Sequence, residues 1–332
     1  MKRLILFMIL ILFFIDSISA LTIKIGSIAP ARSPWDKALR EMSREWKRIS
    51  NGKIRVKIYP GGIAGSEKAM IRKMKIGILG GAVLTNRGIT SIYPDFYVLG
   101  IPLLIQSEAE LNYVTDRMNP YFAKKIEEKG YKVLIWSMAG WVQFFSKRKM
   151  IYPKDLKKHK LSFTTGEPEM EQAWKRNGYQ VIPNELKDMM MALQSGMITA
   201  FYLPPLVAAS GQYFALAPNM LELKVAPLYG GIVVSNRIWN RIPDNIKDQL
   251  LEAGRKISSK LSVQIKELEK KAVNTMIENG LKINNVNPEI KNEWFGESIK
   301  STNYLVGKAF SKDIYDEVKK YLDEFRKKKT DK

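Results

Sequence analysis

Apolar residues recur along this chain at two spacings, one typical of strands and one typical of helices. Residues 21–26 alternate between apolar and polar side chains, and the alternation returns over residues 54–58. Between these stretches, apolar residues recur at helical spacing from Trp35 to Ile49. Ser33 and Pro34 precede the helix as an N-cap and a first-turn proline, and Asn-Gly at 51–52 is expected to end it. The pattern predicts a β-α-β unit.

The same alternation continues through the chain. Further helices are predicted from Ser66 to Gly77 and from Ser107 to Gly130, where Ser107 and Glu110 form a capping box. Strands are expected over residues 131–136, 160–165, 179–183 and 197–202, with helices over residues 168–177 and 185–195. No short repeat or low-complexity linker divides the chain. The fold class is therefore α/β.

A long polar helix is predicted from Pro243 to Asn279, after an apolar run at residues 232–234. It would hold about 36 residues and span about 54 Å, more than the width of a small domain. A helix of this length bridges two lobes or packs against a partner. Two α/β lobes joined by crossing segments enclose a cleft, where ligands usually bind. We therefore expect a two-lobed protein with an interlobe cleft and one helix spanning both lobes.

The N-terminal residues are typical of a secretory signal. Lys2 and Arg3 precede a continuous apolar run over residues 4–15, and Ser19 and Ala20 supply small residues for cleavage. The run is short for a membrane span, although an uncleaved anchor remains an alternative because residue 18 is isoleucine. The chain has no cysteine, so neither a lipoprotein anchor nor a disulfide is expected. We expect residues 1–20 to be a signal peptide cleaved near Ala20, and the protein to be periplasmic.

The expected domain division follows the long helix and the crossing strands. Lobe I would hold residues 21–139 and about 230–265, and lobe II would hold residues 140–229 and about 266–332. The mature chain is long enough to bury a sizeable core without disulfides.

The charge of the chain is strongly positive, with 54 Lys and Arg against 33 Asp and Glu and a net charge of +21. Such a charge raises the question of nucleic acid or an anionic membrane surface. No basic stretch is interleaved with aromatic residues in a nucleic-acid-binding pattern, and the lysines are scattered along helical faces. We therefore expect a solvated basic surface and no nucleic-acid partner.

Residues for enzyme chemistry are scarce. His159 is the single histidine, and its basic neighbours at 157, 158 and 160 predict an exposed surface position. The glycine-rich stretch 60–65 has the wrong spacing for a nucleotide-binding loop and is interpreted as a strand-to-helix turn. No nucleophile elbow or His-Glu metal pair is present. The sequence predicts no enzyme, no cofactor and no metal site.

An ordered set of short stretches carries a family resemblance. It comprises Ser-Pro-Trp at 33–35, Ile-Tyr-Pro-Gly-Gly at 58–62 with Glu67, Ile-Pro-Leu-Leu at 101–104, Tyr-Pro-Lys-Asp-Leu-Lys at 152–157, Ala-Leu-Gln-Ser-Gly at 192–196, and Trp239 with Ile-Pro at 242–243. The chain resembles the substrate-binding subunit of tripartite ATP-independent periplasmic (TRAP) transporters, of the dicarboxylate-binding (DctP-like) type. The resemblance implies a two-lobed protein that closes on a small solute and delivers it to a membrane permease.

Three positions depart from the family pattern. Where the resemblance implies two arginines and an asparagine that hold an organic acid, this chain has Val142, Ser162 and Leu203. Neither valine nor serine can supply the paired donors of a guanidinium. Strand alternation leaves Lys160 open as a replacement charge, and Arg87 is a second candidate.

The departures lie among large apolar residues, including the stretch Ala-Gly-Trp-Val-Gln-Phe-Phe at 139–145. We expect a cleft wall rebuilt as apolar, although the aromatic residues could also be ordinary core. The candidate ligand-binding residues are Trp35, Glu67, Asn86, Trp141, Val142, Phe144, Ser162, Phe163, Phe201, Tyr202, Leu203 and Tyr229.

Three functions remain open at this point. The first is a TRAP solute-binding protein for an apolar or amphipathic solute. The second is an organic-acid-binding member that uses Lys160 or Arg87 in place of the usual arginines. The third is a non-transport sensor or lipid carrier with the same fold, and the resemblance also allows a helical-repeat periplasmic partner protein.

Overall fold

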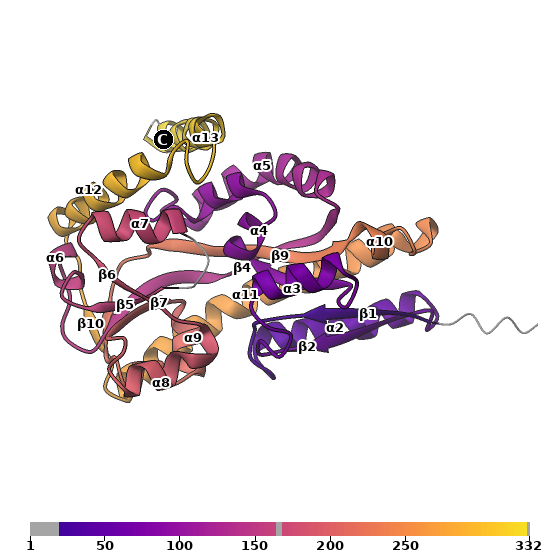
Figure 1. Ribbon diagram of the computed structural model, residues 1–332, viewed down its shortest axis with the longest axis horizontal. Helices are drawn as coiled ribbons and strands as arrows, with labels where there is room; N and C mark the ends of the chain where they lie inside the picture. The colour runs from indigo at the N-terminus through magenta and orange to yellow at the C-terminus, as the bar shows by residue number, and fades with distance from the viewer. Residues whose placement is uncertain (1–19, 164–167, 331–332) are drawn as a thin grey trace, which may run out of the picture.

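The computed structural model describes residues 20–163 and 168–330 (Figure 1). Nearly all of the expected signal peptide, and positions 164–165 of the expected strand 160–165, lie outside these ranges. The strands are β1 (Leu21–Gly26), β2 (Ile54–Tyr59), β3 (Gly81–Thr85), β4 (Tyr131–Ser146), β5 (Lys160–Phe163), β6 (Gln180–Pro183), β7 (Ala200–Leu203), β8 (Asn219–Leu221), β9 (Ala226–Ser235) and β10 (Lys282–Asn284).

Helices lie between the strands and cover both sheets (Figure 1). The α-helices are α2 (Pro34–Ile49), α3 (Glu67–Lys75), α4 (Asn86–Thr90), α5 (Glu108–Glu128), α6 (Pro153–Leu156), α7 (Pro168–Arg176), α8 (Met189–Gln194), α9 (Pro205–Ser210), α10 (Asn236–Trp239), α11 (Asp244–Glu278), α12 (Pro288–Leu305) and α13 (Lys312–Thr330). Three short 3₁₀ helices are η1 (Pro94–Gly100), η2 (Leu186–Asp188) and η3 (Tyr213–Ala215). The α/β fold class is confirmed.

The strands form two sheets that share β4. The order is β2-β1-β3-β9-β4 in the first sheet and β4-β7-β5-β6 in the second, with β8 also paired to β4 and β10 paired to β8. From Tyr131 to Val142, β4 pairs with β9, and from Gln143 to Ser146 it pairs with β7. One strand therefore passes directly from one sheet into the other, as Figure 1 shows at the centre of the molecule.

The strand predicted over residues 131–136 is wrong at its C-terminal end. It continues to Ser146, because register shifts after Val133 and after Met138 absorb irregular residues without ending the pairing. Gly140 lies in the second shift with φ of +124°, a conformation that favours glycine. The apolar stretch 139–145 is therefore the second half of the shared strand, where a bulge bends the chain between the sheets.

The long helix is confirmed, with 35 residues in α11. Its apolar side reaches two separate cores: Leu250 packs in the core that contains Ile23, and Met276 packs in the core that contains Phe201. Figure 1 shows α11 running behind both sheets. The expectation of one helix spanning both halves of the fold is therefore met.

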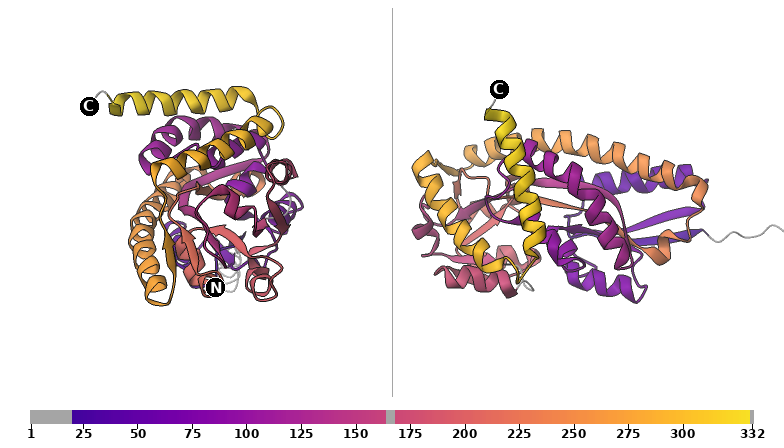
Figure 2. Two further views of the ribbon diagram at one scale, coloured as in Figure 1. Left: turned by 90° about the vertical axis from the view of Figure 1, so that its left-hand side faces the viewer. Right: turned by 90° about the horizontal axis from the view of Figure 1, so that it is seen from above.

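The expected helix starts are also confirmed. The hydroxyls of Ser33, Ser66 and Ser107 each accept a hydrogen bond from a first-turn amide, at 3.4, 3.4 and 3.1 Å. Glu110 departs from the predicted capping box, because its carboxylate accepts from the amide of Gln106. The same carboxylate pairs with Arg326 of α13 at 2.9 Å, and Figure 2 shows α13 lying across α5.

His159 corrects the sequence interpretation, because its side chain is buried and only 4 % exposed. Its Nδ1 lies 3.2 Å from the hydroxyl of Thr199, and burial lowers the pKa of the imidazole. The basic neighbours predicted exposure, but the turn before β5 directs the ring inward instead. No helix within the described ranges is long and apolar enough to cross a membrane.

Candidate ligand-binding cleft

A cleft of about 400 Å³ lies between the two sheets. The first sheet and its helices supply one wall, and the second sheet with η2, α8 and α9 supplies the other. Two residues of the connecting strands, Ala139 and Leu228, form the floor. The remaining lining residues are Ile28, Ala29, Pro30, Trp35, Ser66, Glu67, Lys68, Arg72, Val83, Thr85, Arg87, Gly88, Ser91, Ser162, Asn184, Glu185, Leu186, Met189, Tyr202, Leu203 and Val207.

The cationic lining residues of the described chain all come from the first wall. Lys68 and Arg72 lie one turn apart on α3, and Arg87 lies on α4. The second wall contributes Glu185 as its charged residue, the polar side chains of Ser162, Asn184 and Tyr202, and the apolar side chains of η2, β7, α8 and α9. The two sides of the cleft therefore differ in chemistry.

Glu67 holds the end of β3 in the first wall. One carboxylate oxygen accepts from the amide of Thr85 at 2.5 Å, and the other accepts from its hydroxyl at 3.0 Å. A carboxylate that accepts two such bonds is held in one orientation. The predicted site residue Glu67 thus lines the cleft and shapes its wall.

Arg87 crosses the cleft. Its Nη2 donates to the hydroxyl of Tyr202 on β7 at 2.7 Å, and the guanidinium carbon lies 5.4 Å from the centre of the Tyr202 ring. A cation over an aromatic face is attractive in addition to the hydrogen bond. This contact joins the two walls beside the shared strand.

The second wall contains two of the three departures from the family pattern. Ser162 and Leu203 both line the cleft, and the hydroxyl of Ser162 accepts a hydrogen bond from the side-chain amide of Asn184 at 3.3 Å. Val142 lies instead in a side pocket of about 50 Å³, which shares Arg87 and Tyr202 with the cleft. Asn86, another predicted site residue, lines this same side pocket.

Lys160 does not line the cleft. Its side chain is exposed, and the ammonium group lies 3.4 Å from the carbonyl oxygen of Gly196. Ser162, two residues further along β5, lines the cleft. The Lys160 side chain extends instead toward Gly196 and solvent. Arg87 is therefore the predicted replacement charge that the fold places in the cleft.

The large aromatic residues predicted for the site lie behind it. Phe201 stacks on Phe145 with ring centres 4.9 Å apart, and Phe144 stacks on Trp294 at 5.4 Å. Phe163 is likewise buried in the core. They stiffen the strands that carry the cleft residues, and none of the three lines the cleft.

Trp141 and Tyr229 are also turned into the protein. Trp141 is buried, with the ammonium group of Lys224 5.7 Å from its ring centre. The hydroxyl of Tyr229 accepts from the side-chain amide of Asn119 at 2.8 Å, and its ring is directed toward α5. Tyr229 borders an apolar cavity beside the cleft, described below.

Sequence reasoning missed several lining residues. Lys68 and Arg72 carry a usable signal, because their spacing of four places them on one face of α3. Leu186, Met189 and Val207 carry no comparable signal, since an apolar residue on a short helix is equally typical of the core. No group of three or more potential metal-ligating side chains occurs within the part of the chain that the structure covers.

The comparisons with known proteins agree with this geometry. The family described as "Bacterial extracellular solute-binding protein, family 7" (DctP) matches residues 25–308. Among curated proteins, the 2,3-diketo-L-gulonate-binding periplasmic protein of Escherichia coli is 20% identical over 275 residues, covering 82% of this chain and 83% of that protein.

Two solved structures illustrate the likeness in fold. A TRAP periplasmic solute-binding protein from Ralstonia eutropha H16, with bound (S)-2-acetolactate, superposes with a TM-score of 0.84 at 18% identity, covering 91% of this chain and 99% of that one. The sugar-acid-binding protein of Advenella mimigardefordensis, in complex with galactonate, has a TM-score of 0.84 at 16% identity, covering 92% and 98%. The family match over most of the chain and the shared fold lead to one conclusion: this chain belongs to the DctP family of TRAP periplasmic solute-binding proteins.

Proposed function

We propose that this protein delivers an amphipathic solute, with a polar end and a substantial apolar part, to a TRAP-type membrane permease. The observation that carries the proposal is the difference between the two cleft walls. The first wall holds Lys68, Arg72 and Arg87, whereas the second wall holds Leu203 and Ser162 where the resemblance implies groups that hold an acid. A solute with one polar end and one apolar end matches both walls.

The energetics favour an apolar body against the second wall. Leu186, Met189, Leu203 and Val207 offer no polar partner, so a carboxylate or a row of hydroxyls placed there would lose its hydration without compensation. Each methylene buried against these side chains instead contributes about 0.8 kcal/mol. A handful of methylenes therefore offsets the loss of one acid-binding group.

Binding of a small organic acid is the second candidate function. Arg87 favours it, because its guanidinium lies in the cleft and could hold a carboxylate. Relatives at 16–20% identity include proteins named or solved with diketogulonate, acetolactate and galactonate. Lys160, which lies outside the cleft lining, has no part in this alternative.

The remaining parts of the proposal follow from the family and the expected domain division. The lobes would comprise residues 21–139 with about 230–265, and residues 140–229 with about 266–332, and would close on the solute by hinge motion. The protein would act in the periplasm after signal-peptide cleavage near Ala20 and would not turn its solute over. A role in sensing or lipid carriage would replace the permease by another partner, such as a helical-repeat periplasmic protein.

Titration calorimetry separates the two candidate ligand classes. Succinate, malate, pyruvate and sialic acid are titrated into the mature protein. The proposal predicts affinities weaker than about 1 mM, equivalent to about −4 kcal/mol. Micromolar binding of any of these acids would overturn it in favour of the organic-acid alternative, and loss of that binding in Arg87→Gln would identify the group responsible.

A further inference from the structure

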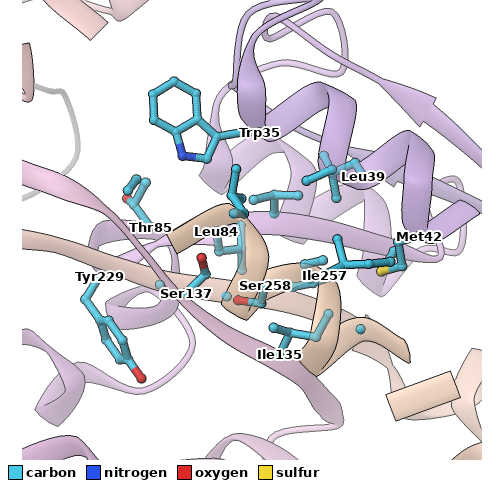
Figure 3. A pocket seen from close by; sticks show the side chains of 18 of the residues that line it. Trp35, Leu39, Met42, Leu84, Thr85, Ile135, Ser137, Tyr229, Ile257 and Ser258 are labelled. Atoms are coloured by element: carbon cyan, nitrogen blue, oxygen red, sulfur yellow. The ribbon is translucent and has the colours of Figure 1, made fainter. Parts of the chain in front are cut away.

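A second cavity, of about 100 Å³, adjoins the cleft inside the first half of the fold (Figure 3). It lies between helices α2 and α11 and strands β3, β4 and β9. Figure 3 shows Leu39 and Met42 of α2 and Ile257 of α11 converging on it above Ile135 of β4. The surface of this apolar cavity is almost entirely apolar, although Thr85, Ser137 and Ser258 also border it.

Three glycines allow the elements around the apolar cavity to approach one another closely. Gly230 and Gly231 of β9 and Gly254 of α11 all border the apolar cavity. An added Cβ at Gly254 would come 2.4 Å from Cδ1 of Ile135, and one at Gly231 would come 2.4 Å from the carbonyl oxygen of Ile135. The close approach of α11 and the strands around the apolar cavity therefore requires glycine at these positions. An apolar cavity of this kind accepts apolar molecules.

The apolar cavity adjoins the cleft. Trp35, Val83, Thr85, Ala139 and Leu228 line both spaces, so they form the boundary between them, called the neck below. Two of these five residues have polar side chains, Trp35 and Thr85. The hydroxyl of Thr85 already donates a hydrogen bond to Glu67 in the first wall. A solute in the cleft thus lies directly beside this apolar cavity.

Trp35 places a hydrogen-bond donor at this neck. Its indole nitrogen is buried and has no hydrogen-bond partner among the residues that the structure describes. Figure 3 shows this nitrogen on the edge of the ring nearest Thr85 and Leu84. A buried N–H without an acceptor is costly, and an oxygen atom of a bound solute would remove that cost.

We infer that the apolar cavity is a subsite for the hydrocarbon end of the solute, and that the Trp35 N–H donates to an oxygen of the solute where the chain enters. This inference rests on the proposed function and deepens it, because it places the terminal carbons of the solute, beyond the portion that lies against the second wall, in a specific space. The occupant is an unbranched alkyl end or a small hydrocarbon ring. A cavity of about 150 Å³ accepts benzene, so this smaller one takes only a few carbon atoms.

A homologous series of straight-chain alkanoates, from butanoate to dodecanoate, tests the inference by calorimetry. As the chain enters the apolar cavity, each added methylene is expected to tighten binding about fourfold, equivalent to ~0.8 kcal/mol, until the space is filled. Ala38→Phe adds a ring from α2 into the cavity, since Ala38 lines it. We expect this variant to remove the dependence on chain length while the shortest alkanoates bind as before.

Three further variants sharpen the test. Lys37→Phe is the matched control, because Lys37 is exposed on the same helix and lines neither space, so the full dependence on chain length should persist. Ala38→Leu makes a smaller change and serves if Ala38→Phe does not fold; it should shorten the optimal chain. Trp35→Phe removes the N–H donor at the neck together with part of the indole ring, and it should weaken every alkanoate by a similar factor.

The outcomes separate this inference from the function on which it rests. If alkanoates bind but Ala38→Phe keeps the same fourfold increments, the apolar cavity is not the subsite, while the amphipathic ligand class survives. If no alkanoate binds and a polar acid does, the proposed function fails and the subsite fails with it.

Discussion

Arg87 and Tyr202 meet across the cleft, with Nη2 of Arg87 2.7 Å from the hydroxyl oxygen of Tyr202. The two residues come from α4, beside the first sheet, and from β7, in the second. Since these elements belong to opposite walls, their hydrogen bond contributes directly to the closeness of the walls. It also places the one cation that spans the cleft, among the residues described, beside the floor formed by Ala139 and Leu228.

Tyr202→Phe should loosen this connection. A hydrogen bond to a charged group contributes about 1.5–3 kcal/mol, so the closed arrangement should be disfavoured by about tenfold or more. Small-angle scattering should give a larger radius of gyration for the ligand-free variant than for the wild type. Tyr121→Phe is the control, because that hydroxyl contacts Tyr93 outside the cleft, and it should leave the radius unchanged. Identical radii for all three proteins would contradict the role assigned to the contact.

Leu203→Asp should weaken an apolar ligand strongly. The substitution places a carboxylate in the second wall, where Leu203 lines the cleft, and a buried unpaired charge costs several kcal/mol. Affinity for a medium-chain alkanoate should fall by at least about 100-fold in calorimetry. Leu203→Met keeps an apolar side chain and should change affinity little. Equal affinities for Leu203→Asp and wild type would show that the solute does not touch this wall.

Glu269 gives a prediction about pH. It lies on α11 against the bulge at Gly140, and burial raises the pKa of its carboxyl to about 7, an effect opposed by nearby Lys224. The folded protein therefore binds this proton more tightly than the unfolded chain. The resulting stability is present below about pH 4.5 and is lost as the pH rises through about 7.

Glu269→Gln removes the titration and keeps the shape. At pH 8 its melting temperature should exceed that of the wild type by about 2 °C or more, and the difference should shrink as the pH falls and vanish below about pH 4.5. Glu267→Gln, at an exposed position on the same helix, should show no such pH dependence. A constant difference between Glu269→Gln and wild type from pH 5 to pH 8 would contradict the raised pKa.

Local sequence signals predicted the framework of the fold well. The serine N-caps at Ser33, Ser66 and Ser107 and the long polar helix depend on short-range patterns, and the structure has them where they were expected. The continuation of β4 to Ser146 could not be predicted in this way. Its bulges are set by pairing with β9, which lies nearly a hundred residues away in sequence.

The candidate site was harder to predict for a physical reason. In a strand covered on both faces, apolar residues at Phe144, Phe163 and Phe201 read the same whether they face a cleft or a core. The hydrophobic pattern located most of the strands approximately, and neither it nor the family resemblance determined which face each side chain takes. His159 failed similarly, because its charged neighbours predict exposure while Thr199, forty residues later, provides the buried partner.

The central claim, that the cleft takes an amphipathic solute, is tested most directly by the solute that the protein retains from its host. The mature protein is purified without denaturation and measured by native mass spectrometry, and the released small molecule is then identified after extraction. The account predicts a mass increment that corresponds to one molecule with a polar end and an apolar chain or ring, and a smaller increment or none for Leu203→Asp. A retained sugar acid or small dicarboxylate, bound equally by Leu203→Asp and lost in Arg87→Gln, would contradict the account.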